Sequence, residues 1–134
     1  CIQKGGSATV NDVLTYGQPV KEKGLNLLQA PGNDLVASLA RAVSGAHMVL
    51  FTTGRGTPFG CPVPTVKISS NTPLSVRKAD WIDFNAGTVA QGESLDSAAD
   101  RLLGFVLQVA SGTQTRSEEN GFREISIFKD GVVL

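Results

Sequence analysis

The chain has 134 residues, of which 41% are hydrophobic and 18% are charged, a composition typical of one globular domain with one core. Twelve basic residues balance twelve acidic ones, whereas chains that bind nucleic acid or an anionic membrane usually carry a basic excess. No apolar run approaches the roughly 20 residues of a membrane helix. No signal peptide is visible, and two cysteines are too few for a disulfide framework, so a reduced, cytoplasmic setting is the default.

The first third of the chain predicts an arm, a strand and a helix. Residues 1–23 are polar and contain glycine, which favours an irregular arm with room for a short helix. Residues 24–31 predict a short strand ended by a proline. Asn33 is a suitable N-cap for a helix in which apolar residues recur at helical spacing until Gly45 ends it.

The middle of the chain predicts two strands with different patterns. Residues 47–53 are apolar without alternation, which is typical of a central parallel strand covered on both faces. With the preceding helix and strand they predict a βαβ unit. Residues 64–69 predict another strand, in which Val66 and Ile68 face one way and Lys67 faces the other.

The last part predicts a strand, a long helix and a hairpin. Residues 71–79 indicate a turn with room for one helical turn, and residues 81–87 a fourth short strand. A long helix follows, capped by Ser94 and ended by Gly112. Residues 123–134 read as a closing hairpin around an Asp-Gly turn.

These elements predict one α/β domain over residues 1–134, with no internal repeat and no linker. We expect a three-layer, mostly parallel Rossmann-like sheet with helices on both faces and a C-terminal β-hairpin. In such folds ligands bind beyond the carboxyl ends of the strands.

A loop rich in glycine and hydroxyl groups follows the strand at residues 47–53. Glycines allow successive N–H groups to point at one anion, and Arg55 would add a fork that matches a carboxylate or phosphate. The residues of this loop predicted to bind substrate are Thr53, Gly54, Arg55, Gly56 and Thr57. A strained turn with an exposed arginine explains the pattern equally well. The loop matches neither a Walker motif nor the dinucleotide fingerprint.

Three further side chains are candidates on or beside the strands. Asn85 stands at the end of the fourth strand and joins the substrate-binding set. Asp83 shares a strand face with Asn85 and is a catalytic candidate, although an acceptor of backbone N–H bonds is the favoured alternative. Lys67 is the other catalytic candidate, and its alternative is a surface lysine with a buried stem.

Metal-binding and thiol candidates are weaker. Glu118 and Glu119 offer oxygen ligands for a hard cation, but a solvated loop accounts for them more simply. Cys61 would need a base, and His47 is the one histidine. The sequence contains no CxxC, HExxH or GxSxG, so the chain lacks a self-sufficient catalytic set.

Five stretches of the chain occur in the order and form of a known family. They are "LLQAPGND", "VLFTTGRGTPFG", "VPTVKISSN", "WIDFNAG" and "EENGFREISIFKDGVVL". Together they resemble the C-terminal region of the altronate and galactarate dehydratases of sugar-acid catabolism, from about Gly5 to Leu134. The tail is more similar to the altronate branch.

The resemblance implies a hydro-lyase that converts D-altronate to 2-keto-3-deoxy-gluconate with a divalent metal, usually iron(II). Family members are longer, and the metal-binding histidines expected in them are not in this chain. The chain also lacks an initial Met. We therefore expect the C-terminal domain of a longer dehydratase, with the other domains as partners and no activity alone. Its part would be the carboxylate grip of Arg55, with base and metal supplied from elsewhere.

Two other functions fit the same residues. One is a non-catalytic module whose glycine loop holds a phosphate or nucleotide. The other is a structural domain that docks its neighbours and makes an oligomer contact, and homo-oligomerisation stays open under every reading.

Overall fold

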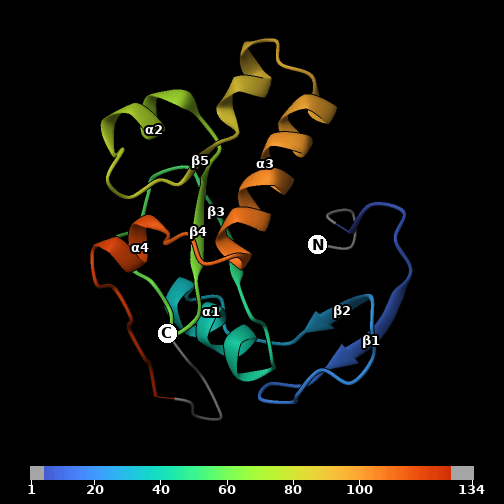
Figure 1. Cartoon of the computed structure of the whole chain (residues 1–134). Helices are drawn as coiled ribbons and strands as arrows, with labels where there is room; N and C mark the ends of the chain where they lie inside the picture. Colours follow the sequence, from blue (N-terminus) through green and yellow to red (C-terminus); the bar gives the residue numbers. More distant parts are fainter. Residues whose placement is uncertain (1–4, 128–134) are drawn as a thin grey trace.

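The chain combines parallel strands with helices in a computed structural model that describes residues 5–127 (Figure 1). The elements are β1 (Val10–Leu14), β2 (Leu25–Leu28), α1 (Asp34–Val43), β3 (Val49–Thr53), β4 (Thr65–Ser69), α2 (Thr72–Arg77), β5 (Phe84–Asn85), the 3-10 helix η2 (Gly87–Gln91), α3 (Leu95–Ala110) and α4 (Arg116–Glu119). The predicted α/β class and parallel pairing are confirmed.

The larger sheet has three parallel strands in the order β3-β4-β5. All five residues of β4 are buried, and Val66 and Ile68 form the hydrophobic core with Phe84 and with Val109 of α3. Strand β3 lies at the edge, and its Leu50 is 49% exposed. The prediction that residues 47–53 form the central strand is therefore wrong. An apolar run shows that a strand is hydrophobic, but it does not show which neighbours will cover it.

The helix ends follow the predicted capping signals. The Asn33 side chain accepts hydrogen bonds from two amides in the first turn of α1, and Gly45 follows the helix with a φ of 108°. The Ser94 hydroxyl accepts from the amide of Ser97 at the start of α3, and Gly112 follows that helix with a φ of 107°. Both glycines adopt the left-handed conformation that favours glycine after a helix.

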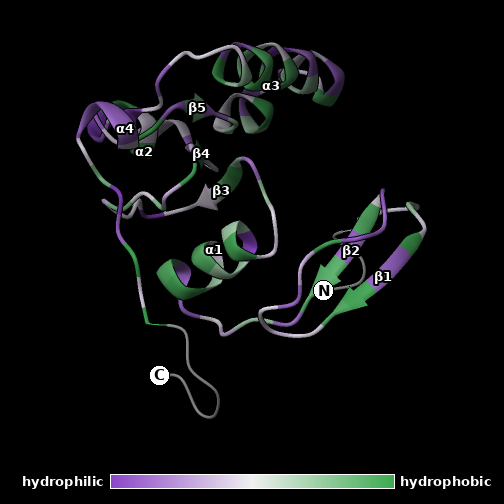
Figure 2. Ribbon diagram, turned by 60° about the horizontal axis from the view of Figure 1, so that its bottom comes forward, coloured by the Kyte–Doolittle hydropathy of each residue, from purple (hydrophilic) through white to green (hydrophobic). Residues whose placement is uncertain are grey.

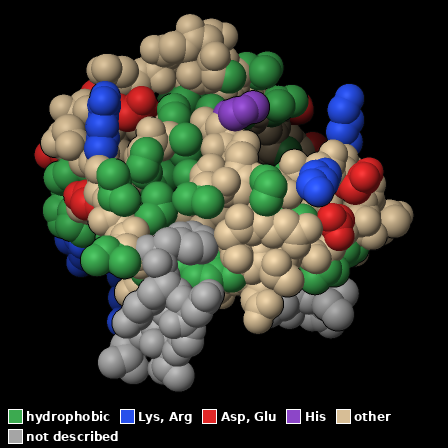
Figure 3. All heavy atoms as spheres, turned by 90° about the horizontal axis from the view of Figure 1, so that it is seen from below, with side chains coloured by type: hydrophobic (Ala, Val, Ile, Leu, Met, Phe, Trp, Pro, Cys, Tyr) green, Lys and Arg blue, Asp and Glu red, His purple; other side chains and the backbone are tan. Residues whose placement is uncertain are grey.

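The smaller sheet pairs β1 with β2 in parallel, and Figure 2 shows it lying apart from β3–β5. We predicted an irregular arm with room for a helix in this part of the chain, and strand β1 lies there instead. Leu14 is 1% exposed, whereas Val13 is 66% exposed. Figure 3 shows hydrophobic side chains at the surface on the face of the molecule seen from below.

The single three-layer Rossmann-like sheet is not confirmed, because the described strands form two separate sheets. The predicted C-terminal hairpin is not confirmed either. Residues 122–127 follow α4 without strand structure, and residues 128–134, including the Asp-Gly turn, lie outside the described residues. Across the described residues, no helix is long and apolar enough to cross a membrane.

Candidate functional site

The three strands of the larger sheet end at the same edge, at Thr53, Ser69 and Asn85, because they are parallel and in register. The glycine loop, residues 54–57, leaves this edge from β3. The turn before α2 leaves it from β4. The structure thus brings the glycine loop and Asn85, which the sequence singled out separately, to one edge of the sheet.

The backbone of the glycine loop turns around the hydroxyl of Thr53. Thr53 Oγ1 accepts hydrogen bonds from the amides of Arg55, at 3.4 Å, and Gly56, at 2.9 Å. Gly56 has a φ of 79°, and a Cβ there would lie 3.1 Å from Cδ of Lys78, so a larger residue is disfavoured twice. Two of the amides predicted to face an anion therefore already have an acceptor within the loop.

Three side chains hold the carbonyl groups of this loop from the side of β4 and α2. Asn71 Nδ2 donates to the Gly54 carbonyl at 3.1 Å. Lys78 Nζ donates to the carbonyl of Arg55 at 2.9 Å. Lys67 Nζ donates to the carbonyl of Thr57 at 2.6 Å. The loop is thus fixed through its backbone, and the exposed guanidinium of Arg55 makes no hydrogen bond or ion pair within residues 5–127.

Asn85, at the end of β5, connects the starts of two helices, α2 and η2. Its Nδ2 donates to Thr72 Oγ1 at 3.0 Å, and its Oδ1 accepts from the amide of Gly87 at 2.9 Å. Gly87 is tightly packed, since a Cβ there would lie 2.5 Å from Cα of Asn71 and closer still to the Thr72 nitrogen. Asn85 therefore holds the start of α2 beside the segment that leads into η2.

Lys67 is almost completely buried, with 1% of its surface exposed, so the alternative of a surface lysine is wrong. Its Nζ lies 4.8 Å from the centre of the Phe59 ring, a cation–π distance. Burial lowers the pKa of Lys67 to about 8, while the negative charges of Asp83 and Glu124 oppose that shift. The side chain of Lys67 therefore lies between β4 and the loop that folds over it.

Asp83 joins β4 to α4 through backbone amides. Its Oδ2 accepts from the amide of Lys67 at 2.6 Å, and its Oδ1 accepts from that of Arg116 at 2.7 Å. Burial raises the pKa of this carboxyl group, and the two amides partly counter the effect. The favoured alternative for Asp83, an acceptor of backbone N–H bonds, is confirmed. Asp83 precedes β5, so its partners differ from those of Asn85.

The comparison with known proteins decides the family. The model for the "D-galactarate/Altronate dehydratase, C-terminal" domain matches residues 1–133. The chain belongs to this dehydratase family. It is 52% identical over 134 residues to an altronate dehydratase from Escherichia coli (strain K12) and 53% identical over 135 residues to one from Bacillus subtilis (strain 168).

A galactarate dehydratase (L-threo-forming) from Escherichia coli (strain K12) is more distant, at 37% identity over 136 residues and 98% of the chain. The two altronate dehydratases are matched over 100% of this chain but over 27% of their own length, and the galactarate dehydratase over 26%. The chain thus spans about a quarter of the length of the curated relatives it matches.

The acidic residues of this dehydratase domain that were candidates for a metal have other partners. Glu118 Oε2 accepts from the amide and the hydroxyl of Thr115, which forms a capping box at α4. Glu119 forms an ion pair with Arg116 at 2.7 Å. Over residues 5–127, no three His, Cys, Asp or Glu residues come together where they could hold a metal ion. The described residues therefore do not fit a metal centre.

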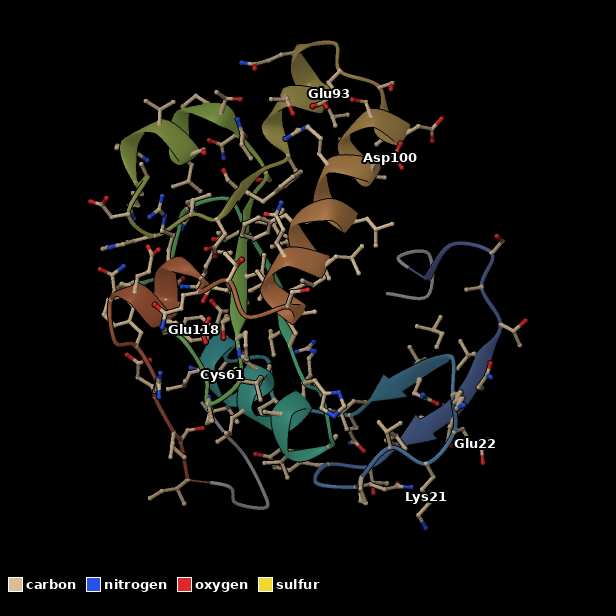
Figure 4. The ribbon with its side chains drawn as sticks, in the orientation of Figure 1. Lys21, Glu22, Cys61, Glu93, Asp100 and Glu118 are labelled. Atoms are coloured by element: carbon tan, nitrogen blue, oxygen red, sulfur yellow. The ribbon has the colours of Figure 1, made fainter. Side chains whose placement is uncertain are left out.

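Cys61 is a buried thiol with local partners. Figure 4 marks Cys61 in the loop between β3 and β4, and marks Glu118 on α4. Cys61 Sγ lies 3.2 Å from Thr65 Oγ1 and donates to the Val63 carbonyl at 3.5 Å. His47 is exposed and is not among these partners.

Sequence reasoning missed residues that hold the glycine loop and the segment after it in this dehydratase domain. Glu124 Oε2 accepts from the amide of Gly60 at 2.9 Å, and the Glu124 amide donates to the Gly60 carbonyl at 2.8 Å. These residues are 64 positions apart, so no local pattern could have paired them. Asn71 carried a usable signal, because it is an N-cap directly before a Thr-Pro helix start.

Proposed function

We propose that the chain is the C-terminal part of a cytoplasmic hydro-lyase that dehydrates D-altronate to 2-keto-3-deoxy-gluconate, and that its glycine loop binds the substrate carboxylate. The higher identity to the two altronate dehydratases than to the galactarate dehydratase supports the choice of substrate. The observation that carries the carboxylate role is the guanidinium of Arg55. It is exposed at the carboxyl edge of the sheet on a loop fixed by three other side chains, and residues 5–127 offer it no partner.

The reaction needs such a group. The proton leaves C2 and the hydroxyl leaves C3, so the elements of one water molecule are lost. The enol that results tautomerises to the 2-keto acid. Negative charge grows on the carboxylate next to C2 as that proton leaves, and a fixed guanidinium stabilises this charge through two parallel hydrogen bonds. Because the loop is already ordered, little reorganisation is needed during the reaction.

The other residues proposed to bind substrate have different roles that depend on their positions. Gly54, Gly56 and Thr57 supply the backbone that surrounds Arg55. We assign Thr53 to shaping the turn, because its hydroxyl already accepts two loop amides. Asn85 lies at the same edge and would border the remainder of the sugar acid.

The remaining catalytic groups are proposed to lie in other regions of the longer enzyme, which would also be the partners of this domain. Lys67 is buried beneath the loop and Asp83 is committed to two backbone amides, so neither is well placed to take the C2 proton. The described residues do not fit a metal ion, and we therefore assign the iron(II) or other divalent metal to those regions as well.

The test replaces Arg55 by Ala and by Lys in the longer enzyme, with D-altronate as substrate and galactarate as the specificity control. Loss of a charge-assisted bond pair of about 1.5–3 kcal/mol predicts a fall of about 10- to 150-fold in kcat/KM for Arg55→Ala. Arg55→Lys should recover only part, because an ammonium cannot form the planar fork. Arg77→Ala, an exposed arginine of α2, is the matched control. Unchanged kcat and KM in Arg55→Ala would refute the proposal.

A second candidate function, the binding of phosphate or a nucleotide, depends on the same guanidinium of Arg55, whose fork also matches a phosphate group. Thermal unfolding of this chain with sugar acids, inorganic phosphate and nucleotides separates the two. Stabilisation by phosphate or nucleotides alone would indicate a non-catalytic anion-binding module. A flat response to every anion would favour a structural domain.

A further inference from the structure

We propose that Lys67 is a positioning residue, whose buried ammonium group holds the Thr57 carbonyl and thereby fixes the glycine loop in the orientation that presents Arg55. The conformational part of this inference stands on the geometry alone. Its consequence for activity rests on the proposed function.

The position of Lys67 suits this role. It lies in the middle of the central strand β4, so its backbone is held on both sides, by the pairing with Phe51 and by the Asp83 amide, which donates to the Lys67 carbonyl. Its Nζ is 2.6 Å from the Thr57 carbonyl and 4.8 Å from the centre of the Phe59 ring. Both contacts belong to the segment that leaves β3. The strand therefore holds that segment from inside the molecule.

The other loop anchors act from a more exposed side. Asn71 and Lys78 hold the carbonyls of Gly54 and Arg55 from α2, and both of these hydrogen bonds are solvent-exposed. The bond from Lys67 is partly buried and shorter. A hydrogen bond shielded from water is stronger than an exposed one, so loss of Lys67 should release the loop more than loss of Lys78.

The charged groups around Lys67 leave the ammonium free for this carbonyl. Asp83 approaches from the segment before β5 and Glu124 from the chain after α4, and the Cys61 thiol lies in the segment between the glycine loop and β4. Asp83 and Glu124 each accept backbone amides. Within the described residues neither forms an ion pair with Lys67. The carboxylates favour the charged lysine at a distance, while the direct partner is the Thr57 carbonyl.

Burial adds a pH dependence to this geometry. The pKa of Lys67 is lowered to about 8, so the ammonium loses its proton well below the pH at which an exposed lysine does. A neutral amine is a weaker donor to a carbonyl than an ammonium group. Opening of the loop would expose Lys67 and return its pKa toward 10.5, so between about pH 8 and 10.5 the open loop binds more protons than the closed one, and loss of the proton does not favour opening. The titration of Lys67 therefore reports its contact with the Thr57 carbonyl through the signals of the loop amides.

The experiment compares the 134-residue chain with Lys67→Met, Lys67→Arg and the exposed-lysine control Lys23→Met by NMR. In the unchanged chain, the amide signals of Arg55, Gly56 and Thr57 should titrate with a midpoint near 8, together with the Nζ signal of Lys67. In Lys67→Met the titration should vanish, and the protection factor of the Gly56 amide should fall at least tenfold. Lys67→Arg should retain part of the protection, and Lys23→Met all of it.

Unchanged protection and an unchanged titration of the loop in Lys67→Met would overturn the proposal. If Lys67→Met does not fold, the Nζ titration of the unchanged chain decides. A loop that titrates together with Nζ supports the proposal, and a loop indifferent to it refutes it.

Activity of the longer enzyme separates this inference from the proposed function. Lys67→Met should raise KM for D-altronate at pH 7. A loosened loop together with an Arg55→Ala enzyme of normal activity would leave Lys67 as a positioning residue and refute the carboxylate role. An unchanged loop in Lys67→Met together with a lowered activity of Arg55→Ala would refute the positioning role of Lys67 and support the carboxylate role of Arg55.

Discussion

The two small sheets are built by the same parallel pairing, yet they differ in how they are covered. In β4 even the polar residues are buried, and Thr65, Lys67 and Ser69 all have hydrogen-bond partners. In β1, the adjacent residues Val13 and Leu14 are 66% and 1% exposed. Pairing alone therefore does not bury a strand. Helix α3 and the glycine-containing segment do so for β4, and two strands alone are marginal in water.

The hydrogen bonds of the two regions also span different distances along the chain. In the arm and the smaller sheet, residues 5–28, the spans are shorter: Asn26 Nδ2 donates to the Glu22 carbonyl four residues away, and the Val20 amide donates to the Ser44 carbonyl 24 positions away. Around the larger sheet, Asp83 binds the Arg116 amide 33 positions away, and Glu124 binds Gly60 across 64. We infer that the larger sheet unfolds as one cooperative unit and that the arm detaches more readily.

The largest expected effect is at the edge of the larger sheet. Gly87→Ala would place a Cβ 2.5 Å from the Cα of Asn71, against backbone that cannot move without disturbing α2. We expect a loss of more than about 3 kcal/mol of unfolding free energy, measured by urea denaturation. Gly104→Ala in α3, where a Cβ meets nothing within 4 Å, is the control and should stabilise by about 0.5–1 kcal/mol. Equal effects of the two would contradict the close packing described here.

The next effect tests how the arm is attached. Leu14 is buried at the end of β1, so Leu14→Ala should destabilise the arm by about 2–3 kcal/mol. Val13→Ala, at an exposed position, should change stability by less than about 0.5 kcal/mol. Hydrogen exchange should show faster exchange in β1 and β2 of Leu14→Ala, with β4 unaffected. Faster exchange throughout β4 would mean that the two sheets form one cooperative unit.

The same contrast explains what could be predicted from the sequence. Helix ends were predictable because Asn33, Ser94 and Gly112 act on amides and carbonyls a few residues away. The side to which Lys67 points followed from strand alternation, but its burial did not, because burial depends on how the Phe59 segment folds over it. The edge position of β3 and the division into two sheets were missed for a similar reason. They depend on contacts between distant parts of the chain.

The candidate site shows this limit as well. Arg55 and its glycines were visible as a local pattern, whereas Lys78 and Glu124, which hold the loop and the segment after it, carry no local signal. The pattern also predicted that the amides of the loop face an anion, whereas the Thr53 hydroxyl accepts hydrogen bonds from two of them. Sequence therefore located the loop, and the structure identified its supports.

A smaller effect is expected from a long-range polar contact inside the larger unit. Asp83→Asn keeps the shape of the side chain but leaves one of two backbone amides facing an NH₂ group, which should cost about 1–2 kcal/mol. The pKa of Asp83 is raised in the folded state, so its contribution is present below pH 3.8 and is lost as the pH rises through the raised value. Unfolding curves from pH 3 to 7 should show this slope in the unchanged chain and not in Asp83→Asn. An equal slope in both would assign it to other groups.

The smallest expected effect is at an exposed contact whose hydrogen bonds span at most eight positions of the chain. Glu93 accepts two hydrogen bonds from Arg101, at 2.8 and 2.7 Å, and one from the Ser97 hydroxyl. These bonds, those of Arg101 first, lower the pKa of Glu93 to about 2. The carboxylate therefore contributes stability that is present above pH 4.5 and is lost as the pH falls toward 2. Because the pair is exposed, solvent and salt screen it, and the contribution should be modest.

Glu93→Gln should accordingly be less stable than the unchanged chain at pH 6, and the difference should shrink to nothing near pH 2. Asp100→Asn, beside Arg101 in α3 and labelled with Glu93 in Figure 4, controls for the loss of one negative charge from this part of the chain. Adding 0.5 M salt at pH 6 should reduce the Glu93 effect, because exposed charges are screened within a few ångströms at that concentration. If the difference in stability between Glu93→Gln and the unchanged chain changed with neither pH nor salt, Glu93 would act through packing at the start of α3. The number of residues that a polar contact spans along the chain would then not predict how much that contact contributes to the stability of this domain.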